Sequence, residues 1–187
     1  MRLLLIPPLV MVACLFAGLY GMAHDQLSYT LSPDYFHHLK FEQFGIWHDP
    51  HVRVGVAQVG WMATWWMGLC IGAPLTLAGL MVPGIAPYAR AVIKSFVIAI
   101  ATAAITGAIG LAVAIPFPVE ELYAPNAPFP AGVSDREAFL EVGVMHNASY
   151  LGGGIGLLVA IAYLLHTGLR QRKTAAMSHT DRQSLGD

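Results

Sequence analysis

The residues best suited to chemistry in this sequence are histidines that stand beside acids or amides. His24 precedes Asp25 and Gln26, and His146 precedes Asn147. Imidazole and carboxylate groups are ligands that zinc, copper and iron take in proteins, and both also form strong hydrogen bonds. Because the two groups lie far apart in sequence, what they can do depends on the elements that position them.

The composition indicates that those elements lie in a membrane. The 187-residue chain is 56% hydrophobic and only 11% charged, with a mean hydropathy of +0.60. A soluble domain carries about twice that share of charged residues. The net charge of −1 offers no basic surface, which excludes nucleic acid as a partner and leaves the lipid bilayer. Cys14 and Cys70 fall within apolar runs and are predicted to be buried thiols rather than a disulfide.

Four apolar stretches are long enough to cross a bilayer as helices. They cover residues 3–22, 57–81, 92–115 and 142–165, and about 20 apolar residues suffice to cross the hydrocarbon core. Only Lys94 is charged within them. The predicted fold is therefore an all-α integral membrane four-helix bundle over residues 1–170, followed by a polar, disordered tail at 171–187. The first stretch could instead be a cleaved signal peptide, and the sequence leaves that alternative open.

The basic residues predict the orientation of the bundle. The positive-inside rule assigns the side richer in Lys and Arg to the cytoplasm, which makes both termini cytoplasmic. Seven residues lie on that side, namely Arg2, Arg90, Lys94, Arg170, Arg172, Lys173 and Arg182, against Lys40, Arg53 and Arg136 outside. Six of the eight histidines fall on the outer side, namely His24, His37, His38, His48, His51 and His146.

The two outer loops differ in character. In the first, residues 23–56, Ser32 and Pro33 have the order of a helix N-cap and first turn. We expect a short helix from Pro33 to Phe44, on the membrane surface or over the mouth of the bundle, and a loop from His48 to Arg53. The second, residues 116–141, is a proline-rich strap that ends at Ser134 and Glu137, whose capping-box spacing predicts the start of the fourth helix.

Small residues and tryptophans mark the faces of the second span. Gly60, Thr64, Gly68 and Gly72 recur every four residues, a spacing that lets helix backbones approach closely, and Gly152 and Gly156 repeat it in the fourth span. We favour packing within one bundle over homodimerisation. Trp61, Trp65 and Trp66 stand where an interfacial aromatic belt belongs, although these rings could also wall a cofactor pocket.

Several short motifs follow one another along the chain: Tyr20-Gly21, His24-Asp25-Gln26, Asp34-Tyr35-Phe36, Gly60-Trp61, Ala63-Thr64-Trp65-Trp66, and His146-Asn147-Ala148-Ser149-Tyr150. Together they resemble an uncharacterised family of bacterial multi-pass membrane proteins with HDQ, acidic-Tyr-Phe, ATWW and H-x-A-S-Y motifs. The stretch from His37 to Gln43 departs from the Gly-His-Pro-Pro run of that family, so a shared site is less expected there. The resemblance implies a bacterial inner (plasma) membrane protein and carries no activity with it.

We interpret the chain first as a non-enzymatic membrane protein whose outer polar cluster organises the bundle or receives a partner, a second copy or another membrane protein. The second interpretation is a metal-binding membrane protein or metalloenzyme in which His24, Asp25 and His146 hold zinc, copper or iron. No hydrolase, nucleotide-binding, haem or zinc-protease motif supports an enzyme, and one charged residue in four spans disfavours a transporter or channel. The expected cluster comprises His24, Asp25, Gln26, Tyr35, Trp65, His146, Ser149 and Tyr150.

Overall fold

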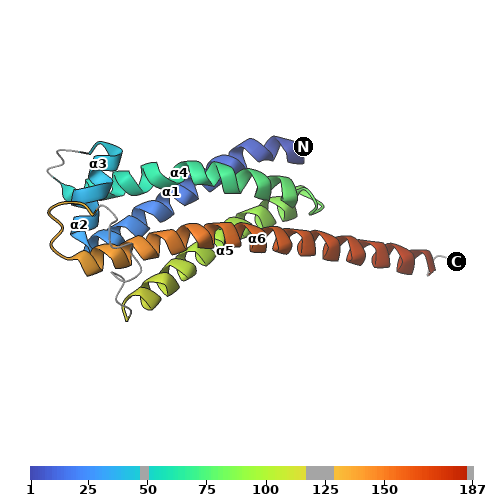
Figure 1. Ribbon diagram of the computed structural model, residues 1–187. Coiled ribbons are helices and arrows are strands. Elements are labelled where there is room, and N and C mark those ends of the chain that lie inside the picture. Colours follow the sequence, from blue (N-terminus) through green and yellow to red (C-terminus); the bar gives the residue numbers. More distant parts are fainter. Residues whose placement is uncertain (47–50, 117–128, 185–187) are drawn as a thin grey trace.

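The computed structural model describes residues 1–46, 51–116 and 129–184, and the regular elements within them are all helices (Figure 1). A short 3-10 turn, η1 (Arg2–Leu5), leads into α1 (Ile6–Leu31), and the other long helices are α4 (Val52–Gly79), α5 (Ile85–Ala114) and α6 (Arg136–Ser184). Four helices are long and apolar enough to cross a membrane. The predicted all-α four-helix bundle is confirmed.

A short helical segment covers one end of the bundle, as predicted for residues 33–44. It consists of α2 (Pro33–Tyr35), the π-helical turn η2 (Phe36–Lys40) and α3 (Phe41–Phe44). Gly45 ends it in a left-handed conformation with φ of 69°, and the amide of Ile46 donates to the carbonyl of Phe41 over 2.8 Å. This is the Schellman arrangement, which only glycine adopts without strain.

The covering segment is held in place by its aromatic side chains. Tyr35, Phe36 and Phe41 are buried and pack against apolar residues of α4 and α6, among them Val59 and Leu140. The segment therefore packs over the mouth of the bundle and does not stand free of it. A second cluster of buried side chains lies nearer the chain termini and contains Leu75, Val82, Tyr88, Val92, Phe96 and Leu164.

The bundle is built from two tightly packed helix pairs, α1 with α4 and α5 with α6, and the two pairs touch each other much less (Figure 1). In the first pair, Gly21 lies against Gly60, and Gly68 lies against the backbone of Cys14. In the second pair, small residues again allow the close approach: Gly107 on Ser149, Gly110 on Ala148, Gly152 on Ala103 and Gly156 on Ala99. The glycine spacing thus serves packing within one chain.

The four long helices all exceed the spans predicted from hydropathy, and α1 and α6 extend farthest past the predicted C-terminal ends. α1 continues to Leu31 and ends at Ser32, whose extended conformation is the one favoured before a proline. Within its last turns, the hydroxyls of Ser28 and Thr30 donate to the carbonyls of His24 and Gln26 (2.9 Å each). α6 runs through Ser184, so the expectation of a disordered tail after Arg170 is wrong. Hydropathy locates only the part of a helix that crosses the hydrocarbon core. The helix itself can continue beyond that part for as long as its backbone hydrogen bonds continue.

Two local predictions about helix starts also need correction. Asp135, not Ser134, caps α6, since its Oδ1 accepts the amide proton of Ala138 over 3.0 Å. Arg53 lies inside α4 rather than in a loop, while His48 lies outside the described residues.

The close approach of α1 and α4 gives a direct test with two matched substitutions. We expect Gly68→Ala to lower the thermal unfolding midpoint in detergent, because a Cβ there would collide with the backbone of Cys14 and Ala13, at a cost of about 1–3 kcal/mol. Gly154→Ala makes the same chemical change where no atom stands within 4 Å, so its midpoint should stay or rise slightly. Equal midpoints would show that the Gly68 face makes no such contact.

Candidate functional site

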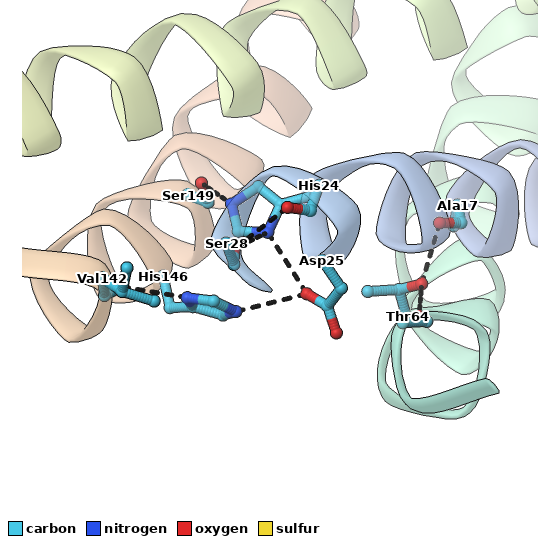
Figure 2. Close-up of polar contacts among 9 residues, drawn as sticks. Ala17, His24, Asp25, Ser28, Thr64, Val142, His146 and Ser149 are labelled. Carbon is cyan, nitrogen blue, oxygen red and sulfur yellow. Dashed lines mark hydrogen bonds and ion pairs between the residues drawn. The ribbon is translucent and has the colours of Figure 1, made fainter. Parts of the chain in front are cut away.

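The candidate site lies beneath the covering segment, where α1 and α6 bring polar side chains together from the two helix pairs (Figure 2). α1 supplies His24, Asp25 and Ser28, and α6 supplies His146 and Ser149. On each helix these residues are spaced one to four positions apart, which keeps them on adjoining faces at one depth. The expectation that His24 and His146 meet at one level is met.

The Asp25 carboxylate is the centre of the cluster. Its Oδ1 lies 3.3 Å from Nε2 of His146 and 3.4 Å from Nδ1 of His24. Asp25 is 4% exposed and His146 is 5% exposed, so water gives them little screening. One ligand atom from each of His24, Asp25 and His146 lies within 4.8 Å of the others.

Hydrogen bonds fix the orientation of both imidazole rings. Nδ1 of His146 donates to the backbone carbonyl of Val142, one helical turn earlier, over 2.9 Å. Nε2 of His24 lies 3.1 Å from the hydroxyl of Ser149, which ties α1 to α6 directly. The hydroxyl of Ser28 lies 3.4 Å from Nδ1 of His24 and donates a hydrogen bond to the backbone carbonyl of His24 (Figure 2).

Aromatic rings close the top of the cluster. The Tyr35 ring stacks on His146 with centroids 4.9 Å apart and planes 33° apart, and the two imidazoles meet edge to face at 4.6 Å. Lys40, from the π-helical turn, is only 7% exposed and places its ammonium 5.6 Å from the centre of the Tyr35 ring. Burial lowers the pKa of the Lys40 amine, and the Asp25 charge opposes that shift.

Hydrogen bonds of Asp34 join the covering segment to the start of α6. The Asp34 Oδ2 accepts hydrogen bonds from the amide and hydroxyl of Ser134, each over 2.7 Å, and from the amide of Asp135 over 3.2 Å. These hydrogen bonds hold the pKa of Asp34 below its usual value. The segment that carries Tyr35 and Lys40 is thus fixed at both of its faces, by apolar packing and by the hydrogen bonds of Asp34.

A cavity of about 80 Å³ extends from the cluster between the two helix pairs. Its polar end is formed by Asp25, His24, His146 and Lys40, and the remaining wall is mostly apolar. The Tyr20 hydroxyl is fully enclosed and interacts with the side chain of Ser149.

The structure brings most of the predicted site residues together, but not all. His24, Asp25, Tyr35, His146 and Ser149 form the cluster described above, and Tyr150 lines the cavity although it is 43% exposed.

Two of the expected site residues lie elsewhere. Gln26 points away and exchanges hydrogen bonds with Arg53 (2.8 and 3.2 Å). Trp65 is 44% exposed on the outer surface of α4, so the prediction that it walls the site is wrong. Its neighbour Thr64 faces α1 instead, donating to the Ala17 carbonyl over 2.8 Å (Figure 2).

Three contributors were missed from the sequence. Tyr20 and Ser28 stand four residues before and after His24, a helical spacing that would have found them had the first helix been extended past residue 22. Lys40 had no such signal, because the π-helical turn shifts the phase of the residues that follow it. Among the other histidines, His37 is exposed and 3.2 Å from the Tyr29 hydroxyl, and His38 lies 3.9 Å from Asp34.

Comparison with known proteins adds no name to this geometry. No family model matches the chain, and no curated protein and no solved structure is significantly similar to it. What the site can do must therefore be argued from its own chemistry: two imidazoles and one carboxylate, shielded from water, at the closed end of an apolar cavity.

Proposed function

We propose that this protein is a metal-binding membrane protein in which His24, Asp25 and His146 hold one transition metal ion. The observation that carries the proposal is the hydrogen bond from His146 to Val142. A backbone carbonyl only accepts, so Nδ1 of His146 must carry a proton and Nε2 of the neutral ring has only a lone pair to offer. That lone pair faces the Asp25 carboxylate at 3.3 Å, where two acceptors would repel.

A positive charge between these two atoms removes the repulsion. It can be a proton, which makes His146 an imidazolium, or a metal ion that both atoms bind. Burial favours whichever option neutralises the carboxylate most completely, since an isolated charge in a membrane-spanning bundle is costly.

Two of the three separations between the proposed ligand atoms suit a metal, and the three atoms together lie within 4.8 Å of one another. In a tetrahedral site with metal–nitrogen and metal–oxygen distances of about 2.0–2.2 Å, two ligand atoms stand about 3.3–3.5 Å apart. Asp25 Oδ1 is 3.3 Å from His146 Nε2 and 3.4 Å from His24 Nδ1, which are such distances.

The surrounding groups support the same proposal. A metal-bound histidine commonly donates its second ring proton to a backbone carbonyl or a carboxylate, as His146 does to Val142. His24 would bind through Nδ1 while its Nε2–H donates to the hydroxyl of Ser149. Two imidazoles and one carboxylate suit zinc, and they also suit iron or copper, with a further position open toward the cavity.

Metal analysis of the purified protein tests the proposal. We expect about one zinc, iron or copper ion per chain, lost in Asp25→Asn and in His146→Gln. His166→Gln is the matched control, because His166 is an exposed histidine on the same helix α6 and should keep the metal. Wild-type protein that contains no metal, and whose unfolding midpoint is insensitive to added zinc and to a chelator, would overturn the proposal and leave a hydrogen-bonded structural or partner-binding cluster.

The proposal extends to orientation: the chain crosses a bacterial inner membrane four times with both termini in the cytoplasm. The excess of Lys and Arg on that side supports this. Arg2 also donates to the carbonyls of Leu80 and Val82 (3.0 and 2.6 Å), at the same end of the bundle as the α4–α5 turn (Figure 1). The cluster of His24, Asp25 and His146 would then face the outer compartment.

Reporter fusions test the orientation. Alkaline phosphatase, which is active only outside the cytoplasm, should be inactive when fused after Pro87 or at the C-terminus and active when inserted near His48 or Asn126. The intact mass of the membrane-bound chain serves as the control for the first span, because a mature chain beginning near Ala23 would leave three spans. An active C-terminal fusion would reverse the proposed orientation.

A further inference from the structure

The cavity between the two helix pairs has an apolar wall and a polar end, and the proposed metal site accounts for only part of that polar end. Its mostly apolar wall comes from small and aliphatic residues of all four long helices, including Ala17, Met67 and Ala103. Its polar end carries Lys40 in addition to the three proposed ligands. The Lys40 amine is not needed to hold a metal ion.

The Lys40 ammonium has ring partners but no acceptor of a hydrogen bond. Within the described residues it makes no hydrogen bond and faces the rings of Tyr35 and Phe44 at 5.6 and 6.0 Å. A buried ammonium that lines a cavity presents donors to it and leaves the acceptor to be supplied by something else.

The charges decide the kind of acceptor. On the proposed function, a metal ion or a proton held between Asp25 and His146 offsets the negative charge of the Asp25 carboxylate. The Lys40 ammonium then leaves an excess of positive charge at this end of the cavity. In a space shielded from water, an anionic oxygen would be bound in preference to a neutral one.

The dimensions decide the rest of the ligand. The cavity volume of about 80 Å³ is near half of the ~150 Å³ that accommodates benzene in an engineered apolar cavity, so a narrow alkyl chain suits it better than a ring. The lining residues of α1 run from Ala13 to Asp25, about 18 Å along the helix axis at 1.5 Å per residue.

We infer that this cavity binds a long-chain fatty acid, with its carboxylate at Lys40 and its alkyl chain between the helix pairs. The carboxylate supplies the anionic acceptor that the Lys40 ammonium lacks. The first methylene groups fill the cavity, and the rest of the chain continues along its opening toward lipid. The inference does not depend on the metal, since it uses different side chains.

Native mass spectrometry with palmitate as the probe tests the inference on the full-length protein in detergent. We expect a saturable one-to-one adduct, with hexadecanol, the uncharged analogue of the same length, at least tenfold weaker. Lys40→Met keeps the length of the side chain and removes the charge, and it should weaken palmitate at least tenfold, whereas Lys40→Arg should retain binding.

Two neighbouring glycines give the matched test of the cavity. Gly153 lines it, with open space out to Ile71 Cδ1 at 3.9 Å from an added Cβ, whereas Gly154 lies beside it in sequence and faces no atom within 4 Å. Gly153→Leu should abolish the palmitate adduct and Gly154→Leu should leave it unchanged.

Metal content measured on the same samples keeps the two proposals separate, because none of these variants removes a proposed ligand. No palmitate adduct, equal binding of hexadecanol, or a decylubiquinone adduct in place of palmitate would overturn the inference. The hexadecanol comparison uses wild-type protein alone, so it remains decisive if a variant fails to fold.

Discussion

The structure depends on one interaction: the buried carboxylate of Asp25 meets an imidazole of the opposite helix pair. Asp25 belongs to α1, and His146, 3.3 Å away, belongs to α6. Each pair is held by the close contact of small residues, but contacts between the pairs are few. The carboxylate, the two imidazoles and Ser149 are the described polar contacts that join α1 to α6. Removing one partner from a buried charged pair typically costs about 3–5 kcal/mol, so this cluster fixes how the two pairs sit.

The cover and the cavity follow from that arrangement. The buried apolar side chains gather in two clusters, one at the covered end and one nearer the termini. Between the two helix pairs, the cavity remains as unfilled space. At the covered end the π-helical turn η2 places Lys40 inside, and α2 places the Tyr35 ring on His146. Water is excluded there, which strengthens every charge interaction in the cluster and makes each unpaired group costly.

Much of the fold was predictable because lipid imposes a simple rule: long apolar runs must be helices. Half of the site followed as well, since His24 and His146 were expected at one depth. The sequence did not predict which side of its helix each residue faces. Successive residues of a helix point about 100° apart, so Thr64 faces α1 while the next residue, Trp65, faces outward. Gln26 departs from Asp25 for the same reason, and Lys40 could not be found because a π-helical turn interrupts the period on which such reasoning rests.

A double-mutant cycle of Asp25→Asn and His146→Gln, measured as unfolding free energy in detergent, tests most directly whether one shared charge joins the helix pairs. We expect a coupling of about 0.5–3 kcal/mol, because either substitution alone already breaks the shared interaction. Gln26→Ala paired with His146→Gln is the control, and it should be additive within about 0.5 kcal/mol, because Gln26 turns to Arg53. Additive losses for Asp25 and His146 would mean that the two residues act independently, and the account of the bundle given above would be wrong.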